Sequence, residues 1–155
     1  MANPTDKETP KLRSYITGQI TGSNRTSLSI ISMMVLIAEE KGIDVYCPER
    51  DTNKGNLDNP EITPEEIYTR DTDAVKKSDF IVIECSNPST GNGLEIMLAY
   101  LFDKRIICVY QKDAAVSRML LGMPSISFII YDTAEDLQNK FTNEIEKIKK
   151  EYLGQ

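Results

Sequence analysis

The fold is decided by residues 79–110, DFIVIECSNPSTGNGLEIMLAYLFDKRIICVY. Apart from Glu84 and Arg105, residues 80–85 and 105–110 are apolar runs rich in β-branched side chains, a pattern typical of strands covered on both faces. The loop at 86–93 contains two glycines and several hydroxyl and amide side chains. Its backbone N–H groups can approach a ligand closely, and ligands of open α/β sheets bind at this edge. The segment therefore predicts a strand, a ligand-binding loop, a helix and a second strand.

The same alternation extends in both directions from this unit. It predicts further strands at 11–17, 43–47 and 125–131, and helices at 25–41, 63–77, 113–122 and 132–153. Capping boxes are predicted at 63–66 and 132–135. A fivefold βα repeat indicates an α/β protein with a five-stranded parallel sheet, helices on both faces and right-handed crossovers, as in Rossmann-like folds. Residues 48–62 are predicted to form a loop at the rim of the ligand-binding edge.

The composition indicates one acidic domain. The chain has 155 residues, a formal net charge of -6 and no histidine, and its pI is about 4.8. We expect a flexible tail at 1–10 and a single domain at 11–155, since that length buries roughly 70% of the unfolded surface. The acidic balance argues against nucleic-acid binding, which requires clustered Lys and Arg. We expect a small-molecule substrate, with acid–base chemistry left to carboxylates, Tyr, Lys, Cys or water.

Cysteine spacing and hydropathy bear on the cell compartment. Cys47, Cys85 and Cys108 each lie in or beside a predicted strand, without metal-ligand spacing. We therefore expect buried thiols in a reducing cytoplasm. The sequence has no basic-then-apolar leader and no apolar run near the ~20 residues that a membrane span requires. The expected protein is soluble and cytoplasmic, with no membrane partner.

The helix predicted at 25–41 is more apolar than one buried stripe requires. Its apolar residues are Ile30, Ile31, Met33, Met34, Val35, Leu36, Ile37 and Ala38. Part of this surface must be covered by something beyond the sheet, and a partner subunit is the simplest cover. The alternative is that the helix is central in a small domain.

Glu95 is the first candidate catalytic residue. It follows Gly93 and Leu94 in the predicted first turn of the central helix. Free N–H groups and the helix dipole favour an ionised carboxylate there, and such a carboxylate acts as a nucleophile or base. The alternative is an ordinary capping box over residues 92–95.

Asp71 is the second candidate, because helical spacing places it on the inward face of the helix at 63–77. An apolar setting would raise the pKa of its carboxyl and suit it to donating a proton. The alternative is an exposed Asp71 that pairs with Arg70 or a nearby lysine. The other residues of the predicted inward stripe are Ile67, Ala74 and Val75.

Three hydroxyl side chains complete the candidate site. Tyr15 lies near the end of the first strand and can reach the edge where Glu95 emerges, although a plain core or rim tyrosine is the alternative. Ser89 and Ser117 are hydroxyls of the kind that bind phosphate, although most such serines are turn or cap residues. In this topology the two carboxylates, the tyrosine and two small-residue loops converge on one edge of the sheet.

At these residues the sequence resembles the nucleoside 2-deoxyribosyltransferase superfamily. The matching segments are YITGQITG at 15–22, Asp71 followed by SDFIV at 78–82, PSTGNGLE at 88–95 and KRII at 104–107. Within the superfamily, the Ser-x-Gly-x-Gly-x-Glu loop at 89–95 and Ser117-Arg118-Met119 look most like 2′-deoxynucleoside 5′-monophosphate N-glycosidases. The resemblance covers residues 13 to about 123.

The resemblance implies a flavodoxin-like fold and a homodimer that cleaves N-glycosidic bonds through a covalent sugar ester, with no metal or cofactor. In that scheme Glu95 attacks C1′, Asp71 contacts the sugar or base and assists protonation of the base, and Tyr15 orients Glu95. Water then releases the sugar phosphate. The implied substrate-binding residues are Gly18, Ile20, Thr21, Gly22, Ser89, Gly91 and Gly93, with Ser117 and Met119 completing the site of the neighbouring chain.

The sequence departs from these relatives at one position. Relatives of the monophosphate type often carry Arg where this chain has Thr21, and Arg25 is the guanidinium that can replace it. If Arg25 does not bind phosphate, an unphosphorylated nucleoside is the expected substrate. Base exchange and non-catalytic nucleotide binding remain alternative functions, and the sequence leaves open both the preferred base and the choice between ribose and deoxyribose.

Overall fold

The computed structural model describes residues 11–19, 25–51 and 61–154. The elements are β1 (Arg13–Thr17), α1 (Arg25–Glu40), β2 (Asp44–Tyr46), α2 (Pro48–Asp51), α3 (Pro64–Lys77), β3 (Phe80–Glu84), α4 (Thr90–Leu101), β4 (Arg105–Gln111), α5 (Arg118–Leu121), β5 (Ile126–Tyr131) and α6 (Ala134–Leu153). The predicted tail at 1–10 lies outside the described residues, as do residues 52–60 of the predicted rim loop.

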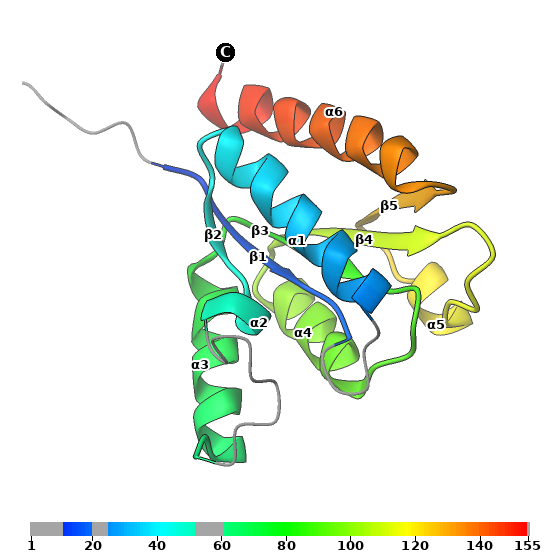
Figure 1. The fold of residues 1–155 in the computed structure, drawn as a ribbon. Helices are drawn as coiled ribbons and strands as arrows, with labels where there is room; N and C mark the ends of the chain where they lie inside the picture. Colours follow the sequence, from blue (N-terminus) through cyan, green and yellow to red (C-terminus); the bar gives the residue numbers. More distant parts are fainter. Residues whose placement is uncertain (1–10, 20–24, 52–60, 155) are drawn as a thin grey trace, which may run out of the picture.

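The strands form one parallel sheet in the order β2-β1-β3-β4-β5 (Figure 1). This confirms the predicted flavodoxin-like fold. The chain runs from β1 outward to β2 and then crosses back to β3, so the order reverses between β1 and β3. Ligands of such sheets bind beyond the carboxyl ends of the strands at this switch point. In this protein the switch point lies between the end of β1 at Thr17 and the end of β3 at Glu84.

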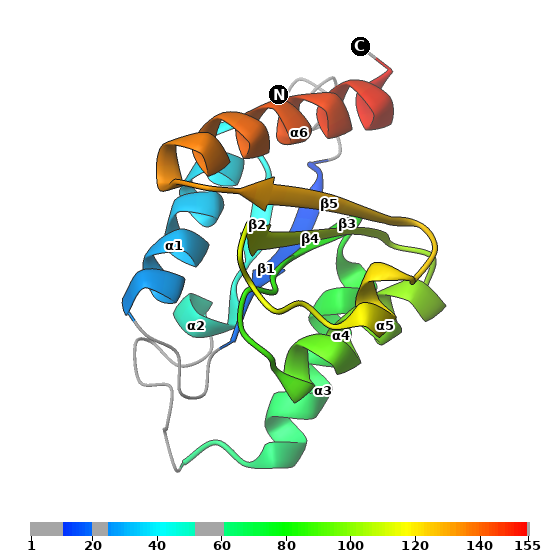
Figure 2. The same ribbon diagram turned by 90° about the vertical axis from the view of Figure 1, so that its right-hand side faces the viewer.

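Two helix layers cover the sheet, with α1 and α6 on one face and α3 and α4 on the other (Figure 2). Successive strand residues point to opposite faces, so Ile16 packs under α1 and α6 while Tyr15 packs under α3 and α4. The β3 strand is buried along its whole length, both the apolar residues 80–83, as predicted, and the charged Glu84. Because Tyr15 belongs to the α3/α4 face, the chemistry of the sheet edge is expected on that face.

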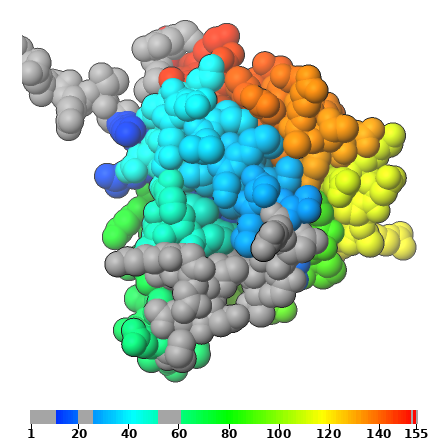
Figure 3. All heavy atoms as spheres, in the orientation of Figure 1, coloured from blue at the N-terminus to red at the C-terminus, as the bar shows by residue number. Residues whose placement is uncertain are grey.

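The apolar excess of α1 is covered by the same chain. Helix α6 packs along α1, and the two helices lie in continuous contact on the surface in Figure 3. The predicted inward residues of α6 are completely buried, namely Leu137, Phe141, Ile145 and Ile148. An ion pair of 2.6 Å between Lys41 and Glu146 joins the end of α1 to α6. The partner subunit inferred from α1 was therefore a wrong explanation of its composition, since among the large apolar residues of α1 only Leu36 is exposed.

Side-chain caps place the helix starts. The Thr63 box is confirmed, since Thr63 Oγ1 accepts from the Glu66 N–H and Glu66 Oε2 accepts from the Thr63 N–H. Helix α4 starts earlier than predicted, because Ser89 Oγ accepts from the Asn92 N–H at 3.3 Å and caps it. Both the first-turn position predicted for Glu95 and its alternative capping box are therefore wrong, because the helix begins at Thr90 and Glu95 lies in its second turn.

Other boundaries differ from the predictions in smaller ways. The capping box predicted at 132–135 is wrong: Thr133 Oγ1 caps α6 by accepting from the Asp136 N–H, but Asp136 Oδ2 accepts from the Asp132 N–H and not from that of Thr133. Helix α5 is shorter than the helix predicted at 113–122. All three cysteines are buried and free, as predicted. Within the described ranges, no helix is both long enough and apolar enough to cross a bilayer.

Candidate active site

The three predicted catalytic residues meet on the α3/α4 face of the sheet. The Tyr15 hydroxyl donates a 2.6 Å hydrogen bond to Glu95 Oε1. The Tyr15 side chain is completely buried, and its ring stacks on Tyr46 with the centroids 5.7 Å apart. A residue of a central strand therefore fixes one oxygen of Glu95. Such a bond holds a carboxylate in one orientation, which is the requirement for directed attack on a carbon atom.

The second oxygen of Glu95 lacks the hydrogen bond that fixes the first. Glu95 Oε2 is buried and has no hydrogen-bond partner among the described residues. Burial raises the pKa of Glu95 to about 8, the Tyr15 hydrogen bond opposes this rise, and the charges of Asp71 and Glu49 add to it. The predicted stabilisation of the ionised form by the helix dipole does not dominate, because Glu95 lies beyond the first turn where that effect acts.

Asp71 lies close to Tyr15 and Glu95. It is half-buried, and burial raises the pKa of its carboxyl, while Arg70 and the Tyr46 hydroxyl lower that pKa. The Tyr46 hydroxyl donates to Asp71 Oδ1 at a long 3.5 Å. The predicted inward orientation of Asp71 is thus confirmed, although Ile67 of the predicted stripe is exposed. A raised pKa is the direction of change that suits a carboxyl to donating a proton.

Glu49 is a third carboxylate that the sequence reasoning missed. It lies in α2, in the segment predicted as a loop, and its charge raises the pKa of both Tyr15 and Glu95. Glu49 accepts from the Cys47 thiol at 3.0 Å and from the Thr17 hydroxyl at 3.4 Å. The available signal was its place directly after a strand, two residues beyond Cys47, at the ligand-binding edge. The site therefore combines three acidic groups around a buried tyrosine.

Four of the predicted binding residues line a separate groove beside α4. This groove has a volume of about 830 Å³ and is lined by both hydroxyl candidates, Ser89 and Ser117, together with Gly93 and Met119. Ser89 caps α4, as the alternative interpretation of this serine predicted. Its hydroxyl oxygen accepts in the cap, and the hydroxyl proton can still be donated to a ligand. Gly93 has open space where a Cβ would be, so the start of α4 presents an uncrowded backbone on this side. Gly91 is exposed in the same turn.

Gly18 has a packing reason to be glycine. A Cβ there would lie 2.7 Å from Ile31 Cδ1 and 3.1 Å from Glu84 Cβ, so the chain leaving β1 passes too close to α1 and β3 for a side chain.

The predicted residues Ile20, Thr21 and Gly22 lie outside the described residues. The backbone of Arg25 begins α1, but the position of its guanidinium is likewise outside the description. In the described ranges no group of three or more His, Cys, Asp or Glu side chains is arranged to hold a metal ion.

Comparison with known proteins relates this geometry to a family. The chain is 35% identical over 123 residues to a putative 2′-deoxynucleoside 5′-phosphate N-hydrolase 1 of Methanosarcina barkeri, covering 77% of this chain and 74% of that protein. The structure resembles that of a CMP N-glycosidase of Clostridium botulinum, with a TM-score of 0.61 and 21% identity over 83% of this chain and 96% of that one.

A second solved structure has the same fold. It is a 2-deoxyribosyltransferase of Bacillus psychrosaccharolyticus, with a TM-score of 0.59 and 16% identity over 82% of this chain and 90% of that one. No protein-family profile matches the chain. The structural likenesses establish the shared fold, and the sequence identity to the Methanosarcina barkeri protein over most of both chains establishes the relationship. The chain therefore belongs to the 2′-deoxynucleoside 5′-phosphate N-hydrolase family.

Proposed function

We propose that the protein hydrolyses the N-glycosidic bond of 2′-deoxynucleoside or nucleoside 5′-monophosphates, releasing the free base and the sugar 5-phosphate. As a member of its family it is an enzyme that cleaves N-glycosyl bonds of nucleotides. The observation that carries the proposed mechanism is the 2.6 Å bond from Tyr15 to Glu95, which leaves the second carboxylate oxygen unpartnered and buried.

Glu95 is the proposed nucleophile. Its ionised carboxylate attacks C1′, a glycosyl ester forms, and the electrons of the C1′–N bond pass to the departing base. The transition state resembles an oxocarbenium ion, which a nearby anion stabilises. Tyr15 is the residue that positions Glu95, and its hydroxyl also limits the cost of ionising the buried carboxyl.

Asp71 is the proposed acid and base. Its protonated carboxyl donates to the departing base in the first step, which avoids expelling an anionic leaving group. In the second step the Asp71 carboxylate takes a proton from water, whose oxygen attacks C1′ and releases Glu95. The two steps together add one water molecule to the nucleotide and return both carboxyl groups to their initial states.

The 5′-phosphate is proposed to lie at the start of α4. Ser89 offers a hydroxyl and Gly91 a backbone N–H group in the first turn of a helix, where the helix dipole favours an anion, and Gly93, whose own N–H donates to the Ser89 carbonyl at 3.3 Å, leaves open space beside them. Ser117 and Met119 lie across the groove, and we propose that they act in the site of a neighbouring chain.

A homodimer is part of the proposal. Leu94, Met97, Tyr100 and Leu101 of α4 are exposed, and we call them the α4 apolar patch. Contiguous exposed apolar side chains mark interaction sites. This patch, and not α1, is the proposed dimer surface. We also propose a cytoplasmic location, which the three buried free thiols support.

Replacement of the nucleophile tests the mechanism. We expect Glu95→Gln to abolish base release from a deoxynucleoside monophosphate. Chromatography of the products measures the released base. Nucleotide binding should stay within roughly tenfold, or about 1.4 kcal/mol, because the amide keeps the shape of the side chain. The control is Glu40→Gln, which changes an exposed carboxylate on α1. Unchanged turnover by Glu95→Gln would remove Glu95 from the mechanism.

Base exchange is the competing reaction of the same fold. Incubation of the protein with one deoxynucleotide and a different free base separates the two activities. Hydrolysis yields free base and sugar phosphate alone. A nucleotide that carries the added base would instead identify a transferase.

A further inference from the structure

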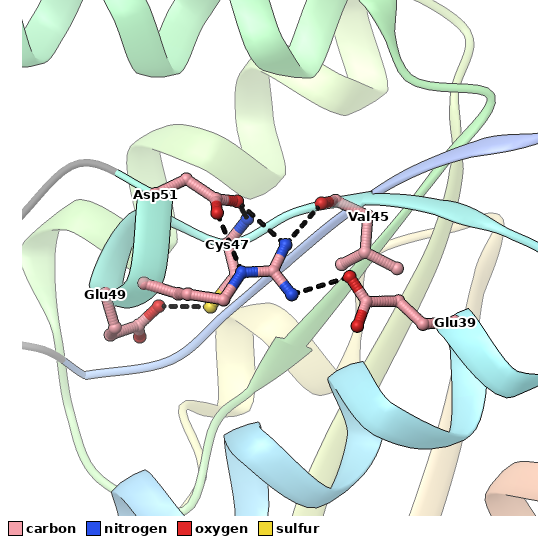
Figure 4. A network of polar contacts seen from close by, with 6 residues as sticks. Glu39, Val45, Cys47, Glu49 and Asp51 are labelled. Carbon is pink, nitrogen blue, oxygen red and sulfur yellow. Dashed lines mark hydrogen bonds and ion pairs between the residues drawn. The ribbon is translucent and has the colours of Figure 1, made fainter. Parts of the chain in front are cut away.

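The segment that carries Glu49 is anchored firmly for its size. Helix α2 has four residues, and Arg50 ties it down by donating to Glu39 Oε1 at 2.6 Å, to Asp51 Oδ1 at 2.7 Å and to the Val45 carbonyl at 2.8 Å. Asp51 Oδ2 also accepts from the Cys47 N–H at 2.8 Å. Figure 4 shows Glu39, Val45 and Asp51 around this network, with Glu49 directed instead toward the sulfur of Cys47. These contacts hold the backbone of α2 against α1 and β2, and so place Glu49 at the end of β2.

Among the described residues, the side chains that donate to the Glu49 carboxylate are weak or distant donors. It accepts one hydrogen bond from a thiol, which is a weak donor, and one from the Thr17 hydroxyl at a long 3.4 Å, and the backbone N–H groups of Gly18 and of Glu49 itself also bond to it. In the part of the chain that the structure describes, no Lys or Arg forms an ion pair with it. An N–H group of a ligand would be a better donor to this carboxylate than the Cys47 thiol or the distant Thr17 hydroxyl.

The order of the strands indicates which part of a nucleotide approaches Glu49. The proposed phosphate position at the start of α4 follows β3, Tyr15 lies on β1, and Glu49 follows β2. In a nucleotide the phosphate and the base project from opposite ends of the sugar. With C1′ at Glu95 and the phosphate toward α4, the base extends toward β2. Tyr46 and Glu49 lie at that end of the site.

We propose that Glu49 determines base specificity by accepting a hydrogen bond from the exocyclic amino group of the base, and so favours cytosine- and adenine-type nucleotides. Uracil and hypoxanthine carry a carbonyl oxygen at the corresponding position, which a carboxylate repels. Carboxylates recognise the amino group of cytosine by the same hydrogen bond in protein–DNA complexes. This inference rests on the proposed function, because it uses the nucleotide orientation given above.

Two nucleotide pairs test the proposal, dCMP with dUMP and dAMP with dIMP. In each pair the first member carries an amino group at this position and the second carries a carbonyl oxygen. We expect the unaltered protein to show a kcat/KM at least tenfold higher for the amino-bearing member of each pair. In Glu49→Gln the amide can donate to the carbonyl oxygen, so both ratios should fall at least tenfold. Glu40→Gln is the matched control and should leave the ratios unchanged. Glu49→Asp, which keeps the charge but shortens the side chain, should retain the direction of the preference.

The outcomes separate this inference from the proposed function. A Glu49→Gln variant that loses activity equally on both members of a pair would overturn base specificity and assign Glu49 a purely structural role. An unaltered protein without preference would overturn it as well. If no nucleotide releases its base, the proposed function fails. The role of Glu49 is then decided by calorimetry, which measures the ratio of the dCMP and dUMP dissociation constants for the unaltered protein and for Glu49→Gln.

Discussion

Glu95 is subject to two opposing requirements. Attack on C1′ needs the ionised carboxylate, whereas burial and the charges of Asp71 and Glu49 favour the protonated form and raise the pKa of Glu95 to about 8. Functional sites commonly hold such perturbed groups, because water is excluded where the chemistry occurs. Among the described residues, the hydrogen bond from Tyr15 is the contact that lowers the pKa of Glu95. Tyr15 therefore acts on the ionisation of Glu95 as well as on its direction.

The pH dependence of catalysis should report this carboxyl. Because the first step needs Glu95 ionised, with a pKa of about 8, and Asp71 protonated, kcat/KM should follow a bell-shaped pH profile, with the midpoint of one limb near pH 8. Removing a neighbouring charge by Glu49→Gln should move the midpoint to lower pH, since that charge raises the pKa. Initial rates from pH 5.5 to 9.5 at low substrate concentration measure both effects. A profile that is flat between pH 6 and 9 would contradict the assignment.

Some site residues were predictable from sequence and others were not. Tyr15, Asp71 and Glu95 belong to regular elements whose periodicity fixes the direction of their side chains, and two of them are joined by a hydrogen bond. Glu49 was missed because α2 has a single turn and no apolar periodicity by which to detect it. Its position depends on contacts of Arg50 with residues on other elements. Such contacts leave no local signal in a sequence.

The first residue of a helix could be predicted only where the capping hydroxyl could be identified from the sequence. The Thr63 capping box has Pro at the first helical position, a signal strong enough to locate α3. Before α4 the sequence pattern assigns the glycines at 91 and 93 to the loop and predicts a helix with Glu95 in its first turn. The Ser89 cap favours an earlier start. One turn of difference changed the electrostatic argument for Glu95, because the helix dipole acts within the first turn.

Two glycines at the ligand-binding edge should respond in opposite ways to the same substitution. Gly18→Ala places a methyl group 3.1 Å from Glu84 Cβ and 2.7 Å from Ile31 Cδ1, so we expect a loss of about 1–3 kcal/mol in the free energy of unfolding. Gly93→Ala meets nothing within 4 Å inside α4, so we expect a gain of about 0.5–1 kcal/mol. Urea denaturation measures both values. Equal effects would show that the approach of β1 to α1 is looser than described.

The quaternary structure should depend on α4 and not on α1. We expect the protein to be a dimer and Leu101→Glu to convert it to a monomer, because a charge in an apolar interface is costly to desolvate. Leu36→Glu is the matched control, since Leu36 of α1 is similarly exposed, at 59% against 67% for Leu101. Light scattering coupled to gel filtration measures the masses. A dimeric Leu101→Glu variant would exclude the α4 apolar patch as the interface.

The packing of α6 on α1 also has a consequence for synthesis on the ribosome. The apolar face of α1 is complete once residue 40 has been translated, but its cover comes from Leu137, Phe141 and Ile145, about a hundred residues later. At ~5–20 residues per second, a nascent chain exposes that face for several seconds. Hydrophobic surface of this kind is what chaperones bind, so translation that halts before α6 should yield an aggregating product even though every residue of the active site has already been made.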